Sequence, residues 1–142
     1  MRDLESEFQT AVAAVIEEET GGDPNGGLTD DPNDPGGLTR WGISKRSHPT
    51  VDVANLTREQ AVAIYRAEYW TPLLPFNLDT KFLRVAFECA INEGMGKTKE
   101  LLPAAKGQLS WFMRDRAMAY VADKNFSIYG RGWLARLFAE VI

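Results

Sequence analysis

Residues 20–38 constrain the fold of this chain more than any other segment, because they cannot continue the helix that precedes them. That helix is predicted from apolar residues at helical spacing: Leu4, Phe8, Ala11, Val12, Val15 and Ile16. Segment 20–38 then holds Gly21, Gly22, Gly26, Gly27, Gly36 and Gly37, with Pro24, Pro32 and Pro35. No apolar period survives there, and a loop of this length inside a small domain is usually functional.

Glu19 is the last residue of the predicted helix and stands where the loop begins. At about 100° per residue, Glu19 falls within roughly 20° of Phe8, whereas Glu17 falls roughly opposite. We therefore expect Glu19 to share the buried stripe, where partial desolvation raises the pKa of a carboxyl and suits it to act as a general acid. The alternative is a glutamate that faces water at a frayed helix end.

The loop is predicted to fold as consecutive turns that lead into a short strand. Asp31-Pro32 and Asp34-Pro35 are turn-forming dipeptides, and Gly36-Gly37 follows them. Residues 38–43 alternate enough to predict a strand, which would carry polar residues back past the helix end. An EF-hand would need an acidic residue twelve positions along, but counting from Asp31 that position is a glycine. We expect no metal, with a looser calcium site as the alternative.

Several motifs together resemble glycoside hydrolase family 108, a family of small N-acetylmuramidases that includes many phage endolysins. The matching segments are Glu19-Thr20-Gly21-Gly22, the run from Asp31 to Ser44, Ala63 to Trp70, Phe87 to Gly94 and Gly132 to Arg136. They occur in order over nearly the whole chain. The chain departs from the family pattern at Thr20, which replaces a glycine, at Glu88, which replaces an aspartate, and in a longer spacer before Asp31.

The resemblance implies a peptidoglycan hydrolase that cleaves the β-1,4 bond between N-acetylmuramic acid and N-acetylglucosamine. In that reading Glu19 is the proton donor, while Asp34 and Thr39 hold a water on the opposite face of the sugar. This predicts inversion, with the two carboxyls about 6.5–9.5 Å apart. Asp34 could instead serve only as a turn former, and Thr39 only as a strand residue. Asp31 is then the alternative second catalytic group.

The predicted substrate-binding residues are Asp31, Arg40, Tyr69, Trp70 and Asn92. Tyr69 and Trp70 could stack on sugar rings, although their helical spacing also suits core residues. Asn92 could cap a helix or make a hydrogen bond in the cleft. No cofactor is expected.

Size and composition restrict the function further. A chain of 142 residues, 44% hydrophobic, supports one domain with a core. The formal net charge of −4 and the lack of a Lys/Arg cluster argue against nucleic acid. The same negative charge gives no attraction to an anionic cell wall, so wall binding should depend on short-range sugar contacts. The single cysteine, Cys89, excludes an internal disulfide and is expected to be a buried free thiol.

The first residues, Met1 to Glu5, lack an apolar signal region, and no run of about 18 apolar residues could span a membrane. We therefore expect the chain to be made in the cytoplasm and to act in the periplasm or cell wall. We also expect it to be a monomer. A holin, a phage tail or a secretion machine would release or deliver it.

The predicted fold class is mostly α, a lysozyme-like α+β domain with a small β-hairpin or loop element beside the active-site helix. Residues 1–72 would form a catalytic lobe, and residues 73–142 a helical lobe that resembles the family's peptidoglycan-associated region. Thr57 and Gln60 fit a capping box for a helix that ends before Pro72. The further helices are expected at 80–92, 98–102, 107–124 and 132–141.

Two other functions fit parts of the sequence. A catalytically silent wall-binding or structural module would explain the altered Glu19-Thr20-Gly21-Gly22 motif. A lytic transglycosylase would need one acid and would release anhydro sugars, but Asp34 and Thr39 then have no role.

Overall fold

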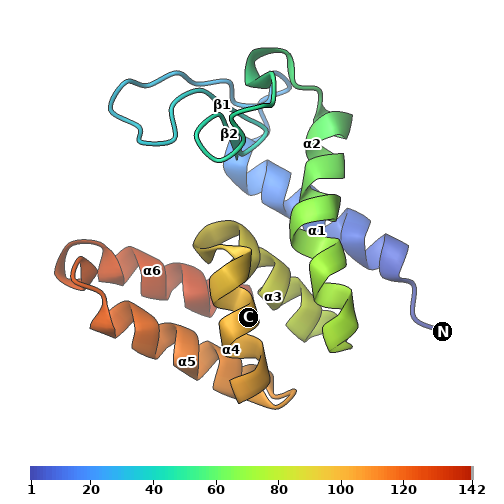
Figure 1. The fold of residues 1–142 in the computed structure, drawn as a ribbon, viewed down its shortest axis with the longest axis vertical. Helices are drawn as coiled ribbons and strands as arrows, with labels where there is room; N and C mark the ends of the chain where they lie inside the picture. Colours follow the sequence, from blue (N-terminus) through green and yellow to red (C-terminus); the bar gives the residue numbers. More distant parts are fainter. Residues whose placement is uncertain (142) are drawn as a thin grey trace. The chain divides into compact units, whose positions relative to one another are not determined.

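The computed structural model describes residues 1–141 and places them in two compact units, Met1–Pro72 and Leu73–Ile142 (Figure 1). The first unit contains α1 (Leu4–Thr20), β1 (Thr39–Arg40), β2 (Ile43–Ser44), the 3-10 helix η1 (Val53–Asn55), α2 (Arg58–Tyr65) and the π-helix η2 (Arg66–Trp70). The 3-10 helix η3 (Thr71–Phe76) leads into the second unit, which contains α3 (Thr80–Glu93), α4 (Met95–Ala105), α5 (Leu109–Ala122) and α6 (Phe126–Val141). The prediction of a mostly helical chain with one small β-element is confirmed.

Helix α1 forms as its sequence predicts. Asp3 caps its N-terminus by accepting a hydrogen bond from the Ser6 amide at 3.1 Å. Gly21 ends it in the left-handed conformation that glycine adopts without strain. The buried residues form the expected stripe: Phe8, Ala11, Val12, Val15 and Ile16. The Phe8 ring packs against Trp70, with the ring centroids 5.4 Å apart, and this contact joins α1 to η2.

The predicted strand at residues 38–43 is wrong, because a hairpin turn divides it. Strands β1 and β2 pair antiparallel, with Thr39 opposite Ser44. Trp41 and Gly42 connect them with φ of 55° and 75°, as a type I′ turn requires. A tryptophan at positive φ is uncommon and must be held by its surroundings. Its amide donates to the Gly26 carbonyl at 2.7 Å, and its indole Nε1 donates to the Leu56 carbonyl at 2.9 Å.

The predicted capping box at α2 is confirmed. The Thr57 side chain accepts from the Gln60 amide, and the Gln60 side chain accepts from the Thr57 amide. The helix does not continue regularly to residue 71, however. It widens into the π-helix η2 and then tightens into η3, which contains Pro72 and Pro75. Proline cannot donate an amide hydrogen bond, which explains why regular α-helix is lost before this segment.

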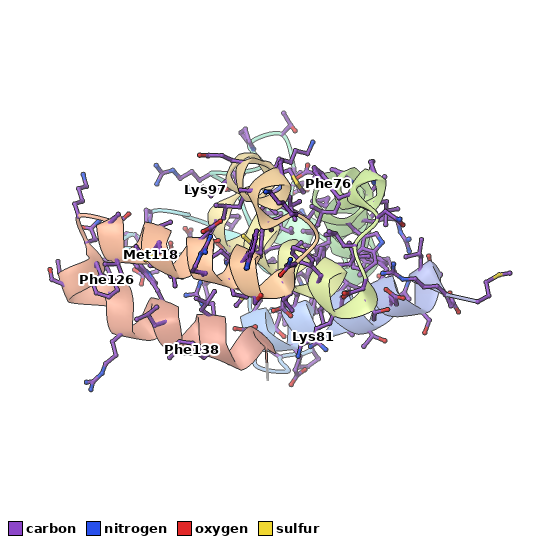
Figure 2. All side chains as sticks on the ribbon, turned by 90° about the horizontal axis from the view of Figure 1, so that it is seen from below. Phe76, Lys81, Lys97, Met118, Phe126 and Phe138 are labelled. Carbon is purple, nitrogen blue, oxygen red and sulfur yellow. The ribbon has the colours of Figure 1, made fainter. Side chains whose placement is uncertain are left out.

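Four helices build the second unit, and α3 with α4, α4 with α5 and α5 with α6 are neighbours (Figure 1). The predicted helices at 80–92 and 107–124 are confirmed to within a few residues. The predicted helices at 98–102 and 132–141 are shorter than the observed helices α4 and α6. The reason is that Gly96, Gly130 and Gly132 lie inside these helices rather than before them. Met118 on α5 and Phe138 on α6 point outward, with 62% and 60% of each residue exposed (Figure 2). Across residues 1–141, every helix is too short or too polar to cross a bilayer.

Candidate active site

The end of α1 lies near β1 and β2 (Figure 1). Glu19 is in that last turn of α1 and contacts the hairpin turn between the two strands. Its neighbour there is Gly42, which has no side chain. A β-carbon on Gly42 would stand only 2.9 Å from Glu19 Cγ and 3.2 Å from Glu19 Cβ. The stem of Glu19 therefore packs directly against the backbone of the turn.

Glu19 is nevertheless exposed, which corrects the expectation that it shares the buried stripe. The angular position on α1 is as predicted, but burial also depends on what covers that position. The covering residue is a glycine, which contacts the stem of Glu19 and leaves the residue open beyond it. The exposure removes the burial on which the sequence argument relied, and the proton-donor role of Glu19 stays a prediction.

Tyr65 is the buried residue closest to this contact. Its side chain is 1% exposed, and its hydroxyl donates to the Trp41 carbonyl at 2.9 Å. Burial raises the pKa of Tyr65, and the charge of Glu19 raises it further. The phenol therefore keeps its proton and its hydrogen bond at neutral pH. Sequence analysis missed both Tyr65 and Gly42 as site residues, although a glycine directly after Trp41 was a signal for a hairpin turn.

Thr20, which departs from the family pattern, closes the end of α1. Its hydroxyl donates to the Ile16 carbonyl at 2.8 Å and accepts from the Gly22 amide at 3.2 Å. The threonine thus satisfies two backbone groups at the helix end next to Glu19.

Asp34 and Thr39 meet at Gly36. A β-carbon on Gly36 would stand 3.2 Å from Asp34 Oδ1 and 3.8 Å from Thr39 Oγ1. Asp34 Oδ1 accepts from the Gly36 amide at 2.8 Å, and Thr39 Oγ1 donates to the Gly37 carbonyl at 3.2 Å. The turn occupies one of the two carboxylate oxygens, and the threonine hydroxyl keeps its acceptor lone pairs. The structure thus places these two predicted residues on either side of the same glycine, and their shared water stays a prediction.

Asp31 forms the preceding turn and is exposed. Its Oδ1 accepts from the Asn33 amide at 2.8 Å, and its carbonyl accepts from the Asp34 amide at 2.9 Å. The predicted consecutive turns are therefore confirmed. Asp31 and Asp34 make the same kind of turn, but only Asp34 lies beside Thr39 at Gly36.

Arg40 holds the loop in place. Its guanidinium donates to the Asn25 carbonyl at 3.0 Å, to Asn25 Oδ1 at 2.7 Å and to the Ala54 carbonyl at 2.6 Å. These three bonds connect segments that are 14 and 15 residues apart in the chain. Arg40 therefore positions the loop, and its predicted contact with substrate stays a prediction.

The two aromatic residues predicted to bind sugar differ in exposure. Trp70 is 2% exposed and packs on Phe8, so it is a core residue, which corrects the prediction that it stacks on sugar. Trp70 is the last residue of the π-helix η2, and its indole points into the core. Tyr69 is half-buried, with its ring centroid 6.0 Å from that of Tyr65, and burial raises its pKa. Tyr69 keeps an accessible edge for a ligand.

Asn92 belongs to the second unit, where it is exposed near the end of α3. The C-terminal cap of α3 is Gly94, whose amide donates to the Ala90 carbonyl at 3.0 Å. The capping alternative for Asn92 is therefore wrong, and its contact with substrate stays a prediction. Within residues 1–141, no three His, Cys, Asp or Glu residues are grouped so that they could hold a metal ion.

A groove of about 420 Å³ lies at the end of α1, where Ile16, Glu17 and Thr20 are among its lining residues. Its charged and aromatic lining comes from Glu17, Asp23, Trp41 and Arg58. Trp41 therefore links the groove to the Glu19 contact, because its carbonyl accepts the Tyr65 hydroxyl.

Comparisons with known proteins give two results. The family model described as glycosyl hydrolase 108 matches residues 14–94, a range that includes Glu19, Asp34, Thr39 and Tyr65. The structure of SagA from Brucella abortus superposes with a TM-score of 0.75 and 22% identity, covering 96% of this chain and 92% of SagA. The predicted mostly helical, lysozyme-like fold is thereby confirmed. Curated protein sequences give no match.

Proposed function

This chain belongs to the glycosyl hydrolase 108 family, and from that membership we propose that it cleaves the glycan strands of bacterial peptidoglycan. The family makes the chain a glycoside hydrolase. The proposed bond is the β-1,4 linkage between N-acetylmuramic acid and N-acetylglucosamine. The observation that carries the proposal is the placement of three residues in the first unit: Glu19 against the hairpin turn, with Thr39 on the hairpin strand and Asp34 beside Thr39.

The chemistry follows from these three side chains. Protonated Glu19 donates its proton to the glycosidic oxygen, so the bond to the anomeric carbon breaks and the leaving sugar departs as an alcohol. A water held by Asp34 and Thr39 attacks the same carbon from the opposite face, and Asp34 accepts the proton of that water. The product sugar then has the inverted configuration. Tyr69 would contact the sugar through its accessible edge.

The test is product analysis on purified peptidoglycan with the wild type and Glu19→Gln. We expect the wild type to release reducing ends and Glu19→Gln to release them at least roughly 100-fold more slowly, since the amide cannot supply the proton. Glu18→Gln is the matched control, because Glu18 is the neighbouring exposed glutamate on α1. Full activity of Glu19→Gln, or equal loss in Glu18→Gln, would contradict the assignment.

The same products separate this function from its alternatives. Proton NMR of the first product should show the inverted anomer, and a retained anomer would remove the water-holding role of Asp34 and Thr39. Anhydro sugars in the mass spectrum would identify a lytic transglycosylase instead. A protein that pellets with the wall without clearing it would be a binding module.

The proposed activity also requires access to the wall, which lies outside the cytoplasm. We propose release through a holin, or delivery by a phage tail or secretion machine. Monomeric action is proposed with it, because the three catalytic groups all come from one unit of one chain.

A further inference from the structure

We propose that Tyr65 and Gly42 form a positioning clamp for Glu19, in which the buried tyrosine holds the hairpin turn and the bare backbone of that turn holds the glutamate stem. This inference rests on the proposed function, because it concerns the acid of that reaction. Tyr65 is a positioning residue here, because it acts on the reaction through Trp41, Gly42 and Glu19.

The hydrogen bond from Tyr65 to the Trp41 carbonyl fixes the turn. Trp41 has φ of 55°, which is unfavourable for a residue with a bulky side chain, so the turn needs external support. A buried hydroxyl that donates to the Trp41 carbonyl at 2.9 Å supplies it, from a residue 24 positions along the chain. The strands of the hairpin are only two residues long, so the bond from Tyr65 of α2 supports the turn together with the Trp41 bonds to Gly26 and Leu56.

Gly42 transmits this position to Glu19. A β-carbon on Gly42 would collide with the Tyr65 hydroxyl and with Glu19 Cγ, so all three groups occupy one small volume. The glycine also has φ of 75°, a conformation that residues with side chains rarely adopt. Only a glycine lets the turn lie close enough to touch both neighbours.

The clamp matters because Glu19 is exposed. An exposed glutamate on a final helical turn has several rotamers available, and only some would place its proton on a glycosidic oxygen. Contact with the Gly42 backbone restricts the first two carbons of that side chain. Misplacing a catalytic group by about 1 Å can lower the rate by roughly 100-fold.

The first test removes only the tyrosine hydroxyl. In Tyr65→Phe we expect kcat on peptidoglycan to fall roughly 10- to 100-fold while KM stays unchanged, because the acid acts in the transition state and not in substrate binding. Tyr129→Phe is the matched control, since Tyr129 is an exposed tyrosine of the second unit. An unchanged kcat in Tyr65→Phe would overturn the proposal.

The second test crowds the clamp from the other side. Gly42→Ala should also lower kcat, because its β-carbon would displace Tyr65 or Glu19. Gly107→Ala controls for backbone strain: Gly107 has the same φ of 75°, but a β-carbon there would meet nothing within 4 Å. If both variants lose the same activity, strain explains the result and the clamp does not exist.

Two further measurements separate positioning from general damage. In a Glu19→Gln background, Tyr65→Phe should cause no additional loss of residual kcat, because its effect passes through Glu19. The carbon-13 resonance of the Glu19 carboxyl, identified by its loss in Glu19→Gln, should move in Tyr65→Phe and Gly42→Ala but not in their controls. This second readout needs no activity. An inactive wild type would refute the proposed function, and an unmoved Glu19 resonance would refute the clamp.

Discussion

Arg116 of α5 is fully buried in the second unit and donates through its Nε to Glu93 Oε2 of α3 at 3.1 Å. The same carboxylate oxygen accepts from the Cys89 thiol at 2.8 Å. Burial is the largest cause that raises the pKa of Cys89 and of Tyr120, and Glu93 raises both further. The Glu93 carboxylate therefore binds two polar side chains of this unit, those of Cys89 and Arg116.

Replacing Glu93 should destabilise the protein strongly. In Glu93→Gln the buried guanidinium of Arg116 keeps its charge but loses the negative charge of Glu93, and breaking a buried ion pair in this way costs about 3–5 kcal/mol of unfolding free energy. Urea unfolding measures this cost. Glu100→Gln is the control, because Glu100 pairs with Lys97 at 3.9 Å on the surface, where a pair contributes about 0–1 kcal/mol. Equal losses in the two variants would contradict the buried pair.

The Cys89 thiol should be unreactive in the folded protein. Burial is the largest cause that raises its pKa to about 12, so at pH 8 the reactive thiolate is scarcely populated. We expect a thiol-reactive disulfide reagent to label the native protein very slowly at pH 8 and the urea-unfolded protein rapidly. Rapid labelling of the native protein would contradict the burial.

The same thiol predicts a loss of stability in alkali. The pKa of Cys89 in the folded chain, about 12, lies above the unfolded value of 9.0. Between these two pH values the unfolded chain releases a proton that the folded chain retains. The contribution of Cys89 to stability is therefore complete below pH 9 and declines between pH 9 and about 12. Cys89→Ser should weaken this dependence. Urea unfolding at a series of pH values tests the sign: a stability that rises over this window in the wild type would contradict it.

Glu5 predicts the opposite dependence in acid. A hydrogen bond from Arg66 is the largest cause that lowers the pKa of Glu5 from 4.5 to about 2, and Gln9 adds to it. The contribution to stability is therefore present above pH 4.5 and is lost as the pH falls toward 2. Glu5→Gln should make the acid limb shallower, as followed by thermal melts between pH 2 and 6. An unchanged limb would show that solvent screens the pair.

Asp34 and Asp31 can be ranked by activity. Asp34→Asn should lower kcat by about 100-fold or more, the usual contribution of a general base, because only Asp34 lies beside Thr39. Asp31→Asn keeps a side chain that can accept the same turn hydrogen bond and should reduce kcat much less. Reducing-end release measures both. A larger loss in Asp31→Asn would make Asp31 the second catalytic group.

Local patterns along the chain were sufficient to predict most helices and turns. The stripe of α1, its Gly21 end and the Thr57 and Gln60 capping box all depend on residues within one or two helical turns of each other. These helix and turn predictions succeeded because hydrogen bonds between near neighbours decide them. The sequence also selected Glu19, Asp34 and Thr39 as catalytic residues, and that selection stays a prediction.

Predictions that needed distant partners failed. The exposure of Glu19 depends on a glycine 23 positions further along, and the burial of Trp70 depends on Phe8 and a π-helical turn. The helix at Phe126–Val141 keeps Gly130 and Gly132 inside it despite the weak helix propensity of glycine, and Gly130 is buried there beside Phe126.

By itself, the sequence determined a capped helix that ends in a glutamate, an acidic loop of consecutive turns behind it, and a mostly helical chain. Only the tertiary structure decided how Glu19 is held, because that depends on Tyr65, Trp41 and Gly42 meeting across the first unit. Periodicity states which direction a side chain faces on its own helix. It does not state what stands opposite, and for Glu19 that is a bare glycine backbone supported by a buried tyrosine.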